Sequence, residues 1–187
     1  MNRDHQRRIE GLVALVLFGL TIPLANWLIG NAGTVCVPNG PCLVPVWPGV
    51  MAPSGVLMVG LALVLRDIVQ RRLGTLAGLG AIAVGTLISA LLAPPAIVIA
   101  SVSAFLLSEL ADFAIYTPLQ RRRFLTAVFA SGMVGLVVDS IVFLYLAFGS
   151  LDFLTGQIIG KAWMVMFALP LMYLMRRRDE RLGLVAA

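Results

Sequence analysis

Six long apolar runs constrain this chain more than any other feature. The hydrocarbon core of a bilayer is about 30 Å thick, and a helix needs roughly 20 mainly apolar residues to cross it. Runs that reach or approach that length lie at approximately 11–30, 49–66, 74–93, 96–117, 124–148 and 153–175. Charged residues make up 12% of the chain, about half of the fraction in a soluble domain. The sequence therefore predicts one all-α transmembrane domain over 1–187, with six transmembrane helices.

The basic residues predict the orientation of these helices. The arginines all lie beside the ends of runs, at Arg3, Arg7, Arg8, Arg66, Arg71, Arg72, Arg121, Arg122, Arg123, Arg176, Arg177, Arg178 and Arg181. The connections 31–48, 94–95 and 149–152 contain neither Lys nor Arg. The positive-inside rule then places both termini in the cytoplasm. This topology accounts for the net charge of +5, and we expect no nucleic-acid partner because no soluble domain remains to carry a binding surface.

Lys161 is the only cation that falls inside an apolar run. A charged side chain within a transmembrane helix is costly, so it marks a functional site and needs a partner. Nearby runs offer Glu109, Asp112 and Asp139. Asp139 lies 9 residues before Phe148 and Lys161 lies 8 residues after Phe153, each counted from the same short connection. At about 1.5 Å per residue the two side chains reach nearly the same depth, which predicts an Asp139–Lys161 pair.

Further polar residues share helix faces with this pair. Glu109 and Asp112 are three residues apart, and Tyr116 continues their face by one turn. Gln157 lies one turn before Lys161. Asp67 directly follows Arg66 at the predicted end of the second run, where its default interpretation is a solvated interfacial acid.

The intramembrane charges do not balance. Glu109, Asp112 and Asp139 against Lys161 leave two excess negative charges if all are ionised. Either an acid is neutral, or water reaches the site, or a ligand brings donors or positive charge. The alternatives are that these residues only hold helices together, or that Asp112 pairs with Arg121–Arg123 at the interface. We favour a ligand site, and the excess of acids makes proton coupling a hypothesis.

The residue types suit a flat polar heterocycle. A carboxylate accepts two neighbouring N–H groups such as those of a guanine-like edge, and an ammonium donates to a ring carbonyl. An aromatic ring supplies a stacking face, and the candidates are Trp27, Trp47, Phe105, Tyr116 and Trp163. An amino acid or a cationic amine fits the same chemistry.

The first outer connection holds the only cysteines, Cys36 and Cys42. An oxidising compartment permits a disulfide between them. We expect no metal site, because the single histidine, His5, lies on the opposite side of the membrane. Pro48, Pro53 and Gly55 predict an irregular start to the second run.

The chain resembles the queuosine precursor transporters, also called the vitamin uptake transporter family. The segments that carry the resemblance are ANWL with Asn26, APSGVLMVGLALVLRDIVQRRLG with Asp67, SELADFAIYTPLQRR with Glu109 and Asp112, GLVVDSIVFLYLAF with Asp139, and GKAWMVMFALPLMY with Lys161. They follow one another across most of the chain, and together they include each intramembrane charge.

The resemblance implies a bacterial inner-membrane protein that takes up the 7-deazaguanines preQ0 and preQ1. It also implies a fold similar to that of the substrate-binding components of energy-coupling-factor vitamin transporters. It places Glu109, Asp112, Asp139 and Lys161 in the substrate pocket, with contributions from Asn26 and Asp67. We add Gln157 and Tyr116 from the shared helix faces. No cofactor is implied, the expected partners are a purine-like substrate and membrane lipid, and a homodimer is one option for the assembly.

Three other functions remain open at this point. The chain lacks a phosphate-binding Gly-x-x-x-x-Gly-Lys-Ser/Thr loop, so it could be a substrate-binding subunit that needs a separate ATPase module. A membrane enzyme is disfavoured, because no His or Cys lies within a run and there is no Ser/His pairing. A structural membrane protein would use the charges for helix packing alone.

Overall fold

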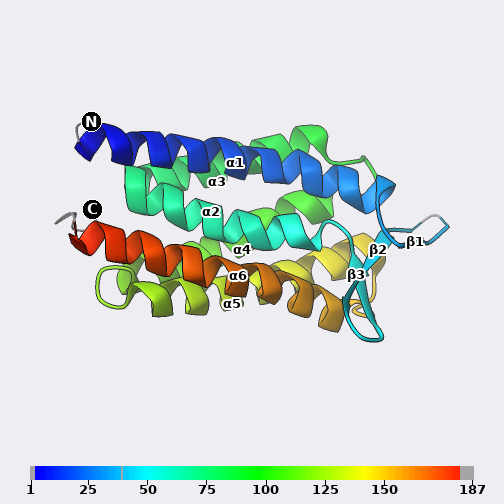
Figure 1. Cartoon of the computed structure of the whole chain (residues 1–187). Helices are drawn as coiled ribbons and strands as arrows, with labels where there is room; N and C mark the ends of the chain where they lie inside the picture. The colour runs from blue at the N-terminus through cyan, green and yellow to red at the C-terminus, as the bar shows by residue number, and fades with distance from the viewer. Residues whose placement is uncertain (1–2, 39, 182–187) are drawn as a thin grey trace.

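Six helices dominate the structure, a computed structural model that describes residues 3–38 and 40–181. Their bounds are α1 Arg3–Asn31, α2 Val56–Leu73, α3 Thr75–Leu92, α4 Val98–Leu119, α5 Phe124–Phe148 and α6 Leu154–Arg181. Figure 1 shows them side by side as one bundle, with both ends of the chain at the same end of it. Among the described residues, five of the helices are long and apolar enough to cross a membrane, and α2 is the exception.

Helix α2 forms the centre of the bundle. It carries Arg66, Asp67, Arg71 and Arg72 within 18 residues, yet 13 of those residues are buried. It packs against α1, α6, α3 and α5, so its polar side chains meet protein instead of lipid. A lipid-facing helix such as α3 shows the opposite pattern, with large apolar side chains exposed along most of its length.

The boundaries of the second predicted run were wrong. The apolar run 49–66 predicted a helix there, whereas α2 begins at Val56 and continues to Leu73. Residues Val50–Pro53 form strand β3 instead. A proline cannot continue a helix without losing a backbone hydrogen bond, and Pro48 and Pro53 bracket this strand. The shift moves Arg66 and Asp67 from a helix end into the middle of a helix.

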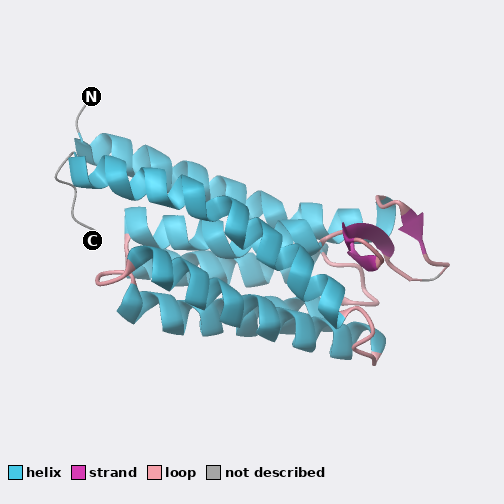
Figure 2. Ribbon diagram, turned by 60° about the horizontal axis from the view of Figure 1, so that its bottom comes forward, coloured by secondary structure: helices cyan, strands magenta, loops and turns pink. Residues whose placement is uncertain are grey.

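The all-α prediction is also incomplete, because the outer connection folds into a small sheet. Strands β1 Val35–Cys36, β2 Cys42–Trp47 and β3 pair in that order, each antiparallel to the next. Cys36 pairs in register with Cys42, and a disulfide joins the two. Figure 2 shows the sheet at the end of the bundle away from the termini.

The sheet is held by the first turns of α6. A Cβ atom at Gly156 would lie 2.1 Å from the carbonyl oxygen of Met51, so only glycine permits this approach. The indole Nε1 of Trp163 donates a hydrogen bond to the carbonyl oxygen of Val46 at 3.0 Å. Gly156 and Gly160 lie one turn apart on α6, and small residues at this spacing commonly allow two helices to approach closely. Here Gly156 allows a strand to approach α6 instead.

An ion-pair network closes the opposite end of the bundle. The carboxylate of Asp179 on α6 accepts hydrogen bonds from Arg71 at 3.0 Å and from Arg72 at 2.9 Å, both on α2. Glu10 on α1 lies 2.9 Å from Arg72 and 2.7 Å from Arg178. These contacts join α1, α2 and α6 where the termini lie.

We expect Gly156→Ala to destabilise the protein by about 1–3 kcal/mol, because the new methyl group has to displace the Met51 backbone. The matched control is Gly80→Ala on the exposed face of α3, where a Cβ meets no atom within 4 Å. Thermal unfolding in detergent measures both variants. Equal melting temperatures for the two variants would contradict the packing of the sheet on α6.

Candidate functional site

Arg66 is the centre of a buried polar cluster. Its side chain has no exposed surface, and its Nε donates a hydrogen bond to Glu109 Oε2 on α4 at 3.0 Å. One terminal nitrogen pairs with Asp112, one turn along α4. The other lies 3.0 Å from Asp67 Oδ1 and donates to Gln70 Oε1 at 3.0 Å. The planar guanidinium thus meets three carboxylates and an amide, which a lysine could not do.

Aromatic rings of α4 complete the surroundings of Arg66. Its Cζ lies 5.7 Å from the ring centre of Phe113 and 5.6 Å from that of Tyr116. The hydroxyl of Tyr116 donates to the backbone carbonyl of Asp67 at 3.3 Å. These contacts join α2 to α4 through groups that cannot be solvated by lipid.

Lys161 forms the second buried cluster, between α5 and α6. Its Nζ donates to Asp139 Oδ2 at 2.6 Å, to Ser140 Oγ at 2.8 Å and to Gln157 Oε1. The predicted Asp139–Lys161 pair is therefore confirmed. An ammonium has three N–H donors, and all three are used within the protein. Lys161 consequently has no N–H left for the ring carbonyl of a ligand.

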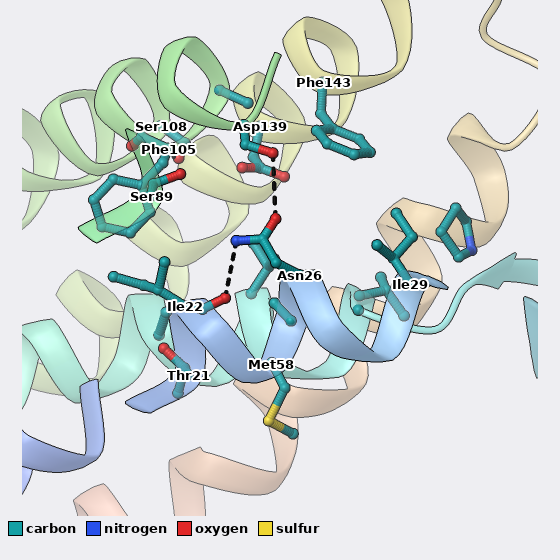
Figure 3. A pocket seen from close by; sticks show the side chains of 18 of the residues that line it. Thr21, Ile22, Asn26, Ile29, Met58, Ser89, Phe105, Ser108, Asp139 and Phe143 are labelled. Atoms are coloured by element: carbon teal, nitrogen blue, oxygen red, sulfur yellow. Dashed lines mark hydrogen bonds between the residues drawn. The ribbon is translucent and has the colours of Figure 1, made fainter. Parts of the chain in front are cut away.

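A cavity lies between α1, α2, α4 and α5, in the half of the bundle nearer the sheet. It offers about 80 Å³ to the centres of water-sized molecules, several times what one water needs. Figure 3 shows Asn26 of α1 facing Asp139 and Phe143 of α5 across this space. The polar side chains that line it are Thr21, Asn26, Ser89, Ser101, Ser108, Glu109, Asp139 and Gln157.

Four of the eight proposed site residues line the cavity: Asn26, Glu109, Asp139 and Gln157. The other four lie behind it. Lys161 contacts the cavity wall through Asp139 and Gln157. Arg66, toward the end of the bundle that holds the termini, is contacted by the remaining three, Asp67, Asp112 and Tyr116.

The aromatic candidates divide in the same way. Phe105 lines the cavity, and so does Phe143, which the sequence did not single out. Trp47 and Trp163 stack on each other with ring centres 6.1 Å apart, away from the cavity. Trp27 is largely exposed. The flat faces that this cavity offers are therefore phenyl rings from α4 and α5.

The sequence reasoning missed Arg66 and misjudged Asp67. The default interpretation of Asp67 as a solvated acid is wrong, because its exposed fraction is 1%. The interfacial pairing of Asp112 with Arg121–Arg123 is wrong as well, because Asp112 contacts Arg66. Gly74 was the available signal. Its φ of +96° follows the last residue of α2, and glycine commonly ends a helix, so a helix extended to it would have contained Arg66.

The charge imbalance persists with the full set of residues. Among the described residues, Asp67, Glu109, Asp112 and Asp139 form ion pairs with Arg66 and Lys161 only, which leaves two excess negative charges if all are ionised. Asp67 Oδ1 lies 3.0 Å from Arg66 without an aligned hydrogen bond, and Asp112 Oδ2 is buried without a donor in the described structure. An oxygen without a donor is costly to bury, and one shared guanidinium does not neutralise three carboxylates, so a proton on this cluster would relieve it.

A family model described as "Putative vitamin uptake transporter" matches residues 86–175. The matched segment holds Glu109, Asp112, Asp139 and Lys161, whereas α1 and α2 lie outside it. Neither a curated protein nor a solved structure matches the chain. Residues 86–175 are thus similar to a family described by uptake of a small molecule, and five helices are long and apolar enough to cross a membrane.

We expect Arg66→Met to lower the free energy of unfolding by about 3–5 kcal/mol, because it leaves three buried carboxylates without their cation. The matched control is Arg176→Met, whose pair with Glu180 is exposed and contributes about 1 kcal/mol or less. Thermal unfolding in detergent compares the two variants. A melting temperature of Arg66→Met close to that of the unchanged protein would contradict the role of this cluster.

Proposed function

We propose that this protein takes up a 7-deazaguanine queuosine precursor, preQ0 or preQ1, across the bacterial inner membrane as a secondary transporter or facilitator. The observation that carries the proposal is the cavity inside the bundle, which combines two carboxylates, two amides and two phenyl rings. The family match to residues 86–175 supports uptake of a small molecule. The 7-deazaguanine ring is the ligand that the composition of the wall suits best.

The carboxylates suit the N–H groups of a guanine-like edge. Glu109 uses Oε2 to hold Arg66, and Asp139 uses Oδ2 to hold Lys161. The other oxygen of each accepts no hydrogen bond from the described residues, although both side chains line the cavity. A ring N–H and an exocyclic amine of the ligand can both donate to one of these open oxygens, which leaves the other for a further donor of the ligand.

Gln157 and the phenyl rings suit the remainder of the ligand. The amide oxygen of Gln157 accepts from Lys161, so the amide nitrogen is left to donate to a ring carbonyl oxygen. Phe105 and Phe143 offer flat apolar faces to the heterocycle. Asn26 is held in place by its own contacts, a donor bond to the Ile22 carbonyl at 3.1 Å and an acceptor bond from Ser101 at 3.5 Å.

The layers of the bundle support uptake from the side of the sheet. The cavity lies nearest the sheet, the Arg66 cluster lies next, and the Asp179 network closes the end that holds the termini. We propose that the terminal end faces the cytoplasm, as its arginines suggest. In this arrangement the cavity is an outward-side site and the two charged layers separate it from the cell interior.

We expect proteoliposomes that contain the protein to accumulate labelled preQ0 or preQ1, and Glu109→Gln to reduce uptake at least tenfold. The reason is the loss of a charged acceptor, which is worth about 1.5–3 kcal/mol. Asp152→Asn is the control, because Asp152 is exposed and bonds only Ser150 within the described structure.

Two other outcomes have definite meanings. Tight binding without uptake would replace the transporter proposal by the alternative, a substrate-binding subunit that needs a separate ATPase module. A folded protein that neither binds nor transports either compound would contradict both the transporter proposal and the binding-subunit alternative.

We also propose that uptake is coupled to protons through the Asp67–Asp112 pair. Arg66 is shared by these two acids and Glu109. In the described structure Asp112 Oδ2 is buried without a donor, and Asp67 Oδ1 lies 3.0 Å from Arg66 without an aligned hydrogen bond. Acid outside and alkaline inside should therefore raise the initial rate of uptake several-fold, and a protonophore should abolish the increase. The assay is the same proteoliposome uptake at equal substrate concentration. A rate that does not respond to the gradient would remove the coupling and leave uptake itself in place.

A further inference from the structure

The buried cations and acids are arranged unequally around the cavity. Glu109 and Asp139 line its wall, whereas Arg66 and Lys161 do not. No Lys, Arg or His lines the cavity among the described residues. The negative groups are therefore the charges nearest to a ligand, and each positive group is screened from it by the carboxylate that it holds.

Neither cation can turn toward the cavity without losing its partners. Lys161 already donates its three N–H groups to Asp139, Ser140 and Gln157. Arg66 pairs with three carboxylates, and two of them, Asp67 and Asp112, do not line the cavity. The charged atoms that the described residues present to the cavity are thus carboxylate oxygens, and a local rearrangement of the two cations does not reverse this.

We propose that the ligand itself carries a positive charge, and that the site selects the aminomethyl 7-deazaguanine, preQ1, over the nitrile-bearing preQ0. This inference rests on the proposed function and concerns which of its substrates the site prefers. The aminomethyl group is an alkylammonium at neutral pH, like the side chain of lysine. The nitrile is uncharged on the same ring, so the two compounds isolate the effect of charge on recognition.

The physical reason is the low polarity of the surroundings. Opposite charges attract more strongly inside a helical bundle than in water, because little solvent screens them. Neither open oxygen of Glu109 and Asp139 receives a donor from the described residues, so the ammonium can donate to the one that the ring edge leaves free. A neutral ligand gains no such attraction to these oxygens, and an anionic ligand is repelled by them.

The test is calorimetric binding to the purified full chain in lipid nanodiscs at neutral pH. The three ligands are preQ1, preQ0 and 7-methyl-7-deazaguanine, which keeps the ring and a one-carbon substituent without the charge. We expect preQ1 to bind at least tenfold more tightly than either neutral compound. The ratio of the dissociation constant of a neutral compound to that of preQ1 measures this preference. Glu109→Gln and Asp139→Asn should each lower the ratio toward one, and Asp152→Asn should leave it unchanged.

Folding of each variant is checked by size-exclusion chromatography and thermal unfolding. Asp139→Asn removes the counter-ion of Lys161, so it is the variant at greater risk of failing to fold. Glu109→Gln leaves Arg66 with two other carboxylates and carries the test if Asp139→Asn does not fold.

The outcomes separate this inference from the proposed function. If preQ0 or the methyl compound binds as tightly as preQ1, the inference is overturned while the proposed function stands. If the ratio is large but the same in both carboxylate variants, the ammonium is recognised elsewhere and the inference is again overturned. If none of the three compounds binds, the proposed function fails and the inference fails with it.

Discussion

The pairing of Arg66 with three buried carboxylates is the interaction on which the rest of the bundle depends. Helix α2 is too polar to face lipid, and the cluster makes it the centre of the protein by joining it to α4. The other helices then surround α2 and present their apolar side chains outward. A hydrocarbon solvent cannot hydrate charges, so the bundle has to enclose them. The cavity and its acidic wall follow from that enclosure, because Glu109 belongs both to the cluster and to the wall.

Two cations organise the site without entering it. Arg66 and Lys161 each hold one wall carboxylate by a single oxygen, so the acids are oriented by the protein and remain open on their other side. This arrangement pre-orients acceptors for a ligand at little cost in side-chain freedom on binding. The far ends of the bundle are closed by different means, a disulfide-linked sheet at one end and the Asp179 network at the other.

Much of the fold and part of the site could be predicted from particular residues. The apolar runs located five helices well. The Asp139–Lys161 pair was identified because the two residues lie at nearly equal distances from the short connection between their helices. The second run was misplaced because Pro48 and Pro53 interrupt it, and hydropathy does not distinguish an apolar strand from an apolar helix. That displacement concealed Arg66 and made Asp67 look interfacial. Phe143 was missed because nothing in an apolar run distinguishes a ring that lines a cavity from one that faces lipid.

The sequence by itself determined that this is a multi-helix membrane protein with costly charges inside its helices, because period, length and composition alone decide what a bilayer accepts. Only the tertiary structure decided which charges meet and which face the cavity. Arg66 and Glu109 are 43 residues apart in the chain, and no local pattern relates them. The same holds for the role of Lys161. Its position in an apolar run marked it as important, but its three contacts, all within the protein, show that it holds the wall and does not line the cavity.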